Sequence, residues 1–278
     1  AVCTQIKVPE IGSAKAVYCD CKALEYYISY CRKHSEINQP VFYVLACRIG
    51  FCIEHYQRKI HQIGGKLYVN PDGNEWKRKK WSLPVRCYWK FSERQMVKNA
   101  DALICDSINI EAYIKHEYAK YHPKTRFIPY GAEKISNIDQ KREEKLKAWL
   151  EKKNLIAGNY YLMVGRFVPE NNYETVIMEF LKSDSSRKLA IITGDNHKLR
   201  KRISRRTMYQ KDTRICFAGT VYDQKLLQMI RENAFAYIHG HEVGGTNPSL
   251  LEAMSCTNVN LLLDVVFNQE VGSDAALY

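Results

Sequence analysis

The sequence lacks any uninterrupted apolar run of about 18 residues, the length at which a membrane-spanning helix is suspected. It also shows no internal repeat and no low-complexity tract. Hydrophobic residues nevertheless make up 46% of the 278 positions, which is enough to form real cores. We therefore expect one large or two ordinary globular domains rather than a membrane-spanning chain.

The cysteine spacing of metal sites and disulfide frameworks is missing as well, although the chain has ten cysteines. Cys19 and Cys21 form a C-x-C, and no repeated C-x2-C or C…H-x3-H pattern accompanies them. Cys105 and Cys216 lie in apolar runs, where a thiol behaves as a small hydrophobe. We expect reduced cysteines in a cytoplasmic protein, and neither a metal nor another cofactor.

Charge, by contrast, is abundant and unbalanced, with a formal net charge of +12. Such an excess predicts attraction to an anionic partner, either nucleic acid, a phosphate-bearing substrate or an acidic membrane face. The alternative is a basic surface that only keeps the protein soluble.

Short apolar runs alternate with helical patterns along the whole chain, which predicts α/β architecture with parallel sheets. In the first half, strands are expected at 40–47, 66–69, 102–105 and 126–129, with helices at 82–99 and 109–118. The charged stretch 132–159 reads as a helical connection. In the second half, strands are expected at 160–164, 189–193, 214–218, 234–239 and 259–263, with helices at 172–181, 223–232 and 248–255. The predicted domains are 1–134 and 135–278.

A glycine loop followed by a helix start, GGTNPSLLEAM, comes directly after the strand predicted at 234–239. Glycines allow close approach of the backbone to a ligand, and a helix start offers N–H groups and partial positive charge to a diphosphate. Glu252 lies one turn into the helix, where a carboxylate suits two ribose hydroxyls. The alternative is an ordinary loop. The candidate donor-binding residues here are Glu242, Gly244, Gly245, Thr246, Asn247, Ser249, Leu250 and Glu252.

Two further strand ends carry residues of the type that bind nucleotides. Gly165 and Arg166 follow the strand at 160–164, and a guanidinium can grip phosphate at the carboxyl edge of a parallel sheet. Asn171 opens the next helix. Thr220, Val221 and Tyr222 follow the strand at 214–218, where backbone groups could read a base. A purely structural arginine is the alternative for Arg166.

The first half contributes a turn and a basic segment. Asp72 and Glu75 follow the strand at 66–69 and are candidates for orienting an acceptor hydroxyl. Alternatively, they form an Asx turn and a Glu75–Arg78 pair. The segment that follows mixes cations with tryptophans, which suits an anionic bilayer, single-stranded nucleic acid or merely solvent. Its members are Trp76, Lys77, Arg78, Lys79, Lys80 and Trp81.

The order strand–GRF, strand–GTV and strand–loop–PSLLEAM resembles the donor domain of family-four GT-B glycosyltransferases. Glu252 matches the second glutamate of their E-x(7)-E motif, whereas Gly244 stands where the first is expected. Glu242 is close enough to substitute if the loop is two residues longer. Asn171 replaces the lysine that usually follows the arginine, so phosphate neutralisation would depend more on Arg166 and the helix start.

Longer segments resemble the bacterial rhamnosyltransferases that add β-1,4-linked L-rhamnose. These are YVNPDGNEWKRKKWS, ICDS, FIPYGAE, GRFVPENNYE and GTVYDQ. The resemblance implies a GT-B fold of two Rossmann-like domains with a cleft between them. It also implies an earlier glycine-rich segment and a C-terminal part that this sequence lacks.

The activity implied by the resemblance is a retaining transfer of L-rhamnose from dTDP-L-rhamnose to a lipid-diphosphate-linked sugar. The enzyme would lie at the inner face of the cell membrane and act in cell-wall or capsular polysaccharide synthesis. The family expects no metal and no protein nucleophile. Two alternatives remain open at this point, a UDP-hexose donor on the same fold and a basic nucleic-acid-binding protein.

Overall fold

The computed structural model describes residues 3–34, 36–78, 80–133 and 140–278. The chain divides into two compact units, Ala1–Pro129 and Tyr130–Tyr278. The predicted boundary between 134 and 135 lies outside the described residues. All strand pairs among the described residues of both units are parallel, so the α/β prediction is confirmed.

The first unit is built on a four-stranded sheet in the order β1-β2-β3-β4. Buried side chains alternate along β1, where Phe42 and Val44 are buried while Tyr43 is exposed. This period of two packs one face of the strand into the core. The elements are α1 (Lys15–Lys33), β1 (Val41–Leu45), α2 (Ile53–His61), β2 (Lys66–Asn70), α3 (Leu83–Asn99), β3 (Ala102–Cys105), α4 (Ile108–Glu117) and β4 (Thr125–Phe127).

Local signals explain where α4 starts and which face it buries. Ser107 caps the helix, since its hydroxyl accepts a hydrogen bond from the N–H of Ile110. Ile110 and Ile114 are four residues apart and both are buried. They therefore share the face that packs toward the strands.

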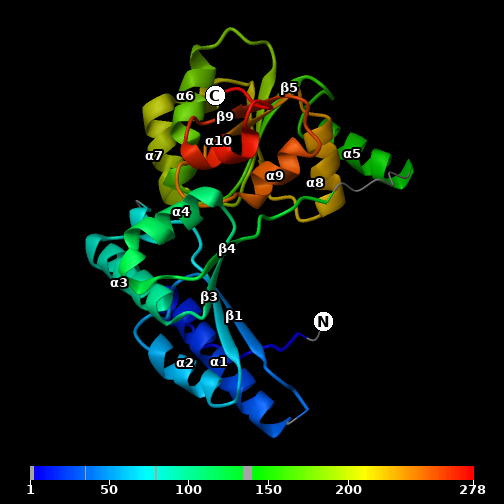
Figure 1. Cartoon of the computed structure of the whole chain (residues 1–278). Helices are drawn as coiled ribbons and strands as arrows, with labels where there is room; N and C mark the ends of the chain where they lie inside the picture. Colours follow the sequence, from blue (N-terminus) through cyan, green and yellow to red (C-terminus); the bar gives the residue numbers. More distant parts are fainter. Residues whose placement is uncertain (1–2, 35, 79, 134–139) are drawn as a thin grey trace. The chain divides into compact units, whose positions relative to one another are not determined.

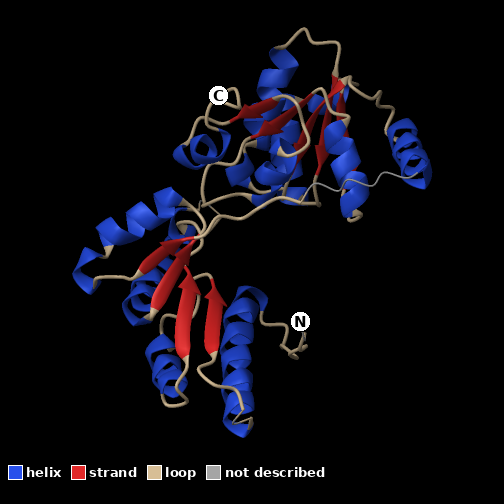
Figure 2. Cartoon of the chain, turned by 45° about the vertical axis from the view of Figure 1, so that its right-hand side comes forward, coloured by secondary structure: helices blue, strands red, loops and turns tan. Residues whose placement is uncertain are grey.

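The second unit has a five-stranded sheet in the order β7-β6-β5-β8-β9. Figure 1 and Figure 2 show helices on both faces of this sheet. The elements are α5 (Gln140–Lys152), β5 (Tyr160–Val164), α6 (Tyr173–Lys182), β6 (Lys188–Ile192), α7 (His197–Thr207), β7 (Ile215–Gly219), α8 (Gln224–Glu232), β8 (Ala236–His239), α9 (Pro248–Met254), β9 (Asn260–Leu262) and α10 (Val266–Gly272).

Each face of the second sheet has its own apolar core. On one face, Ile177 of α6 and Ile203 of α7 pack with Ile191 of β6. On the other face, helices α5, α8 and α9 cover residues such as Leu162 of β5. The result is a three-layer α/β sandwich of the doubly wound type.

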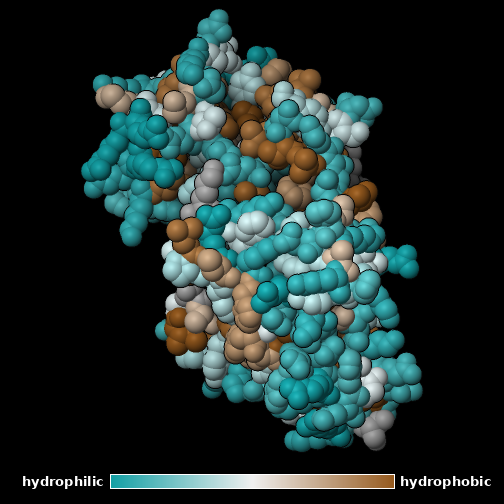
Figure 3. Space-filling view, turned by 60° about the vertical axis from the view of Figure 1, so that its left-hand side comes forward, coloured by the Kyte–Doolittle hydropathy of each residue, from teal (hydrophilic) through white to brown (hydrophobic). Residues whose placement is uncertain are grey.

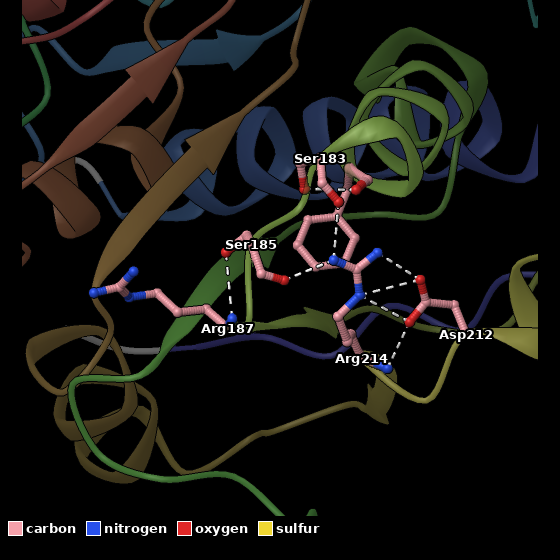
Figure 4. Close-up of polar contacts among 6 residues, drawn as sticks. Ser183, Ser185, Arg187, Asp212 and Arg214 are labelled. Carbon is pink, nitrogen blue, oxygen red and sulfur yellow. Dashed lines mark hydrogen bonds and ion pairs between the residues drawn. The ribbon is translucent and has the colours of Figure 1, made fainter.

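An arginine side chain joins two chain segments at the amino end of this sheet, as Figure 4 shows. Arg214, just before β7, donates to the carbonyl oxygens of Ser183 and Ser185 at 3.0 and 2.6 Å. It also pairs with Asp212 at 2.7 Å and lies over the ring of Phe180. The loop before β6 is thus fixed to the start of β7.

The face seen in Figure 3 is mostly hydrophilic, with smaller apolar patches. Such patches are ordinary, because much of any protein surface is apolar. Within the described ranges, no helix combines the length and the apolar character needed to cross a bilayer.

Candidate functional site

The carboxyl edge of the second sheet contains a topological switch point. Strands β5, β6 and β7 follow one another in one direction, whereas β8 and β9 continue from the other side of β5. The loops that follow the neighbouring strands β5 and β8 therefore lead away in opposite directions along the sheet. In open parallel sheets, ligands bind at this place.

Three hydrogen bonds join these two loops, although they are about 70 residues apart in the sequence, and a fourth lies within the loop after β5. The amide nitrogen of Asn171 donates to the carbonyl oxygen of Arg166 at 2.7 Å. Its amide oxygen lies 2.7 Å from Nδ1 of His241, which must donate because an amide oxygen only accepts. Asn172 donates to the carbonyl of Gly240 at 2.8 Å, and the N–H of Glu242 donates to the carbonyl of Glu170 at 3.0 Å.

The hydrogen bonds between the loops after β5 and β8 form a clamp in which the backbone approaches Gly240 too closely for any side chain, and Gly165 nearly so. A Cβ on Gly240 would lie 2.6 Å from the carbonyl oxygen of Asn171. A Cβ on Gly165 would lie 3.1 Å from the Asn171 amide nitrogen. Gly165 was predicted to belong to the site, whereas Gly240 was missed. Its position between two histidines, directly after a strand, is the signal that could have found it.

A buried histidine also lies at the carboxyl edge of the second sheet. His239, the last residue of β8, is 5% exposed, and its Nε2 makes no hydrogen bond within the described residues. Burial, together with the neighbouring His241, lowers the pKa of His239 to about 3. This imidazole is therefore uncharged at neutral pH, whereas Arg166, on the loop after β5, is an exposed cation.

Helix α9 corrects one part of the sequence-based prediction. Asn247 caps it, with its side-chain oxygen accepting from the N–H of Ser249 at 3.0 Å, while the N–H of Leu250 donates to the Asn247 carbonyl at 3.0 Å. These two N–H groups are therefore not free for a diphosphate. Any anion-binding N–H groups in this segment would belong to the preceding loop at 244–247.

Two side chains predicted to bind the donor face the interior instead. Leu250 is fully buried in the core that α8 and α9 cover. The Ser249 hydroxyl lies 3.2 Å from both Tyr237 Oη and Arg231 Nη2. Both side chains pack toward the interior of the unit, so this geometry does not favour contacts between them and a donor.

Glu252 lies beside a cavity rather than among solvated residues. Its Oε2 is 2.7 Å from Nη2 of Arg231, and its side chain is 39% exposed while that of Arg231 is 3% exposed. The cavity has a volume of about 320 Å³, near the lower end for small-molecule pockets. It is lined by Gly131, Ala132, Glu133, Gln224, Gln228, Arg231, Glu252 and Ser255.

The remaining candidates of the second unit are more dispersed. Thr220 and Tyr222 are exposed after β7, which is separated from β5 by β6. Glu242 is closer to the clamp, because its Oε2 lies 3.3 Å from the amide nitrogen of Asn172. Gly244 has φ +148°, and Gly245 and Thr246 complete the loop that leads to α9.

In the first unit, the carboxylate of Glu75 has three partners within the protein. Its carboxylate lies 2.5 Å from Arg78 Nε and 2.9 Å from Lys80 Nζ, and it accepts from Trp81 Nε1 at 2.9 Å. Burial by itself would raise the pKa of Glu75, but Arg78, Lys80 and Trp81 together lower it. Asp72 takes part in a turn, with its N–H donating to the side chain of Asn70 at 2.7 Å.

These contacts also correct the predicted basic patch. The side chain of Arg78 is only 7% exposed, because it pairs with Glu75, so it does not belong to a surface that meets lipid. Lys77 stacks over Trp76 at 5.3 Å, and Lys80 over Trp81 at 4.7 Å. Lys79 lies outside the described residues. Among the described residues, no three His, Cys, Asp or Glu side chains are grouped as metal ligands.

Comparison with known proteins gives one family match and many similar solved structures. Residues 1–133 match a family described as a domain of unknown function, DUF1972. No curated protein matches the sequence. Among solved structures, sucrose-phosphate synthase from Thermosynechococcus elongatus aligns with a TM-score of 0.69 and 18% identity, covering 96% of this chain and 66% of that one.

Two other structures extend the comparison. A glycosyltransferase from Rickettsia africae ESF-5 aligns over 96% of this chain and 67% of its own, with a TM-score of 0.64 and 10% identity. Anabaena Alr3699/HepE in complex with UDP aligns over 95% and 73%, with a TM-score of 0.58 and 11% identity. The chain has the GT-B fold. It spans about two thirds of the length of sucrose-phosphate synthase.

Proposed function

We propose that this chain is the core of a glycosyltransferase that binds a nucleotide-sugar at the carboxyl edge of its second sheet. The observation that carries this proposal is the hydrogen-bonded clamp between the loops after β5 and β8. It fixes the backbone at the exposed Arg166, and glycine at positions 165 and 240 allows the two loops to pack closely. A rigid edge with an exposed cation suits the diphosphate of a leaving nucleotide.

The chemistry we propose is a retaining transfer without a protein nucleophile. The donor's own phosphate oxygen would take the proton of the acceptor hydroxyl on the same face of the sugar. The protein would then position both substrates and stabilise the leaving diphosphate through Arg166. Glu252, half-exposed beside its cavity, would accept hydrogen bonds from the ribose hydroxyls.

For the donor we favour dTDP-L-rhamnose, as the sequence motifs at 68–82, 165–174 and 219–224 suggest. A UDP-sugar is the second candidate. It is supported by relatives of the same fold whose structures contain UDP or UDP-2-fluoro glucose. Both donors share the nucleoside diphosphate, so the clamp serves either one.

The acceptor we propose is a lipid-diphosphate-linked sugar, reached at an anionic membrane face. The net charge of +12 favours such a surface. Within the basic segment, Lys77 is exposed, and Lys80, which pairs with Glu75, has a side chain that is 25% exposed. Replacing both with alanine should reduce sedimentation with vesicles rich in phosphatidylglycerol while leaving nucleotide binding intact. Unchanged sedimentation would leave the segment without a role in membrane binding.

The proposed function is tested by titrating the 278-residue chain calorimetrically with dTDP-rhamnose, dTDP, UDP-glucose and UDP. We expect dTDP-rhamnose to bind most tightly, and Arg166→Ala to weaken its binding about 10- to 100-fold, as loss of a charged hydrogen bond does. Lys182→Ala removes an exposed cation from the far end of α6 and should not change the affinity. Absence of binding by all four compounds would refute the proposal, and a preference for UDP-glucose would replace the donor.

A further inference from the structure

Two cysteines of the first unit lie within reach of each other. Cys21 is on α1 and Cys52 is the residue that precedes α2, and their sulfur atoms are 3.6 Å apart. A disulfide bond measures about 2.05 Å, so closure requires a movement of roughly 1.5 Å. Both side chains are partly buried rather than sealed in the core.

The two thiols differ in their chemistry. The pKa of Cys21 is lowered to about 7, chiefly by the hydrogen bond from Cys52, and Tyr56 contributes in the same direction. Burial opposes this change, as do the neighbouring carboxylates of Asp20 and Glu25. The same contact raises the pKa of Cys52. One sulfur is therefore a partial thiolate at neutral pH, and its neighbour keeps its proton.

Other cysteines near this pair are less suited to react with it. Cys19 is two positions from Cys21 on the same helix, so it points to a different side. Cys47 is buried, and burial raises its pKa well above the ordinary value. Thiolate character and access together decide which cysteine is oxidised.

We propose that Cys21 and Cys52 form a reversible disulfide when the protein meets a mild peroxide oxidant. The Cys21 thiolate attacks one oxygen of hydrogen peroxide, breaking the O–O bond and giving a sulfenic acid and hydroxide, which takes up a proton to become water. Cys52 sulfur then attacks the sulfenic sulfur, its thiol proton leaves with the hydroxyl group as a second water, and the S–S bond forms. Two thiols are oxidised and one peroxide is reduced.

The bond would join α1 covalently to the start of α2. Closing the loop between positions 21 and 52 restricts the unfolded chain, so oxidation should raise the midpoint of thermal unfolding by several degrees. Thiol reductants such as dithiothreitol should restore the original midpoint, since thiol–disulfide exchange is reversible.

Peptide mapping under non-reducing conditions tests the proposal. Trypsin should release Ala16–Lys22 joined to Ile49–Arg58, with a mass lower by two hydrogen atoms than the sum of the separate peptides. The first peptide contains both Cys19 and Cys21. The link should therefore persist in Cys19→Ser and disappear in Cys21→Ser and Cys52→Ser. Cys87→Ser, which changes an exposed thiol, is the matched control and should keep the link.

A second measurement does not depend on disulfide formation. The rate of alkylation of Cys21 should rise with a midpoint near pH 7, and in Cys52→Ala this midpoint should move upward because the donor to the thiolate is gone. No linked peptide after peroxide treatment of the folded wild-type chain would overturn the proposal. So would a link through Cys19, or the same alkylation profile in Cys52→Ala and in wild type.

Discussion

At the scale of single residues, Asn171 stands where the resembling family usually has lysine. The sequence indicates a loss of positive charge at this position. In the structure, its two amide atoms bind the Arg166 carbonyl and His241, so the residue positions the loops and does not contact solvent widely. A lysine could donate to the carbonyl but could not accept from the imidazole.

Asn171→Ala should therefore affect both stability and ligand binding. Two buried groups lose their partner, which should lower the free energy of unfolding by about 1–3 kcal/mol. Nucleotide affinity should fall as well, because Arg166 is no longer held. Urea unfolding and calorimetric titration measure the two effects. Asn159→Ala, at an exposed asparagine, is the control, and equal behaviour of both variants would contradict the positioning role.

His239 predicts a specific dependence of stability on pH. Its folded pKa of about 3 lies below the ordinary value of 6.5, so the unfolded chain binds more protons between these values. This contribution to stability is complete above pH 6.5 and is lost as the pH falls toward 3. The slope can approach 1.4 kcal/mol per pH unit within the window.

Urea unfolding of wild type and His239→Phe from pH 7.5 to 4.5 measures this contribution. Phenylalanine keeps a ring of similar size but cannot titrate, so the variant should lose less stability than wild type on acidification. Parallel curves for the two proteins would show that His239 does not titrate in this way.

At the scale of elements, strands and helices differed in how well they could be predicted. The strands of both sheets were found because buried parallel strands are continuous apolar runs. Helices α1, α2, α7 and α10 were missed. Helices α2 and α10 are short, with nine and seven residues. Helix α1 has only Leu24 and Ile28 buried, and α7 only Leu199 and Ile203. So few buried residues on a charged or aromatic helix leave no clear apolar stripe to read.

The candidate site was predictable only in part for a related reason. Gly165 and Arg166 could be assigned from their position after a strand. The bond between Asn171 and His241 joins residues about 70 positions apart, and it exists because β5 and β8 are neighbours in the sheet. Strand order was not available from local pattern, and neither was the inward orientation of Ser249. The pair of Glu75 with Arg78, by contrast, was one of the two interpretations that the local sequence offered.

The amino end of the second sheet gives an element-scale prediction. Arg214→Ala removes the bonds that join the loop before β6 to β7, and should lower the free energy of unfolding by about 1–3 kcal/mol. Nucleotide affinity should be unchanged, because the candidate site is at the opposite edge. Lys182→Ala breaks only an exposed pair with Glu179 and should change stability by less than about 1 kcal/mol. Equal destabilisation by the two changes would show that Arg214 does not fix this loop.

At the scale of the whole molecule, the GT-B fold places two parallel α/β units in one chain, and the proposed donor site belongs to the second. The first unit carries the basic segment, whose cations are largely engaged with Glu75 and with tryptophan rings. Net charge alone would have favoured a nucleic-acid partner as readily as a phosphate-bearing one. The fold and the strand-end clamp are what favour a nucleotide-sugar.

A crystal structure of the chain with dTDP bound would show directly where the nucleotide lies. We expect the diphosphate within hydrogen-bonding distance of Arg166, at the loops that follow β5 and β8, with the ribose near Glu252. A nucleotide bound elsewhere on the second unit, or on the first unit alone, would contradict this expectation.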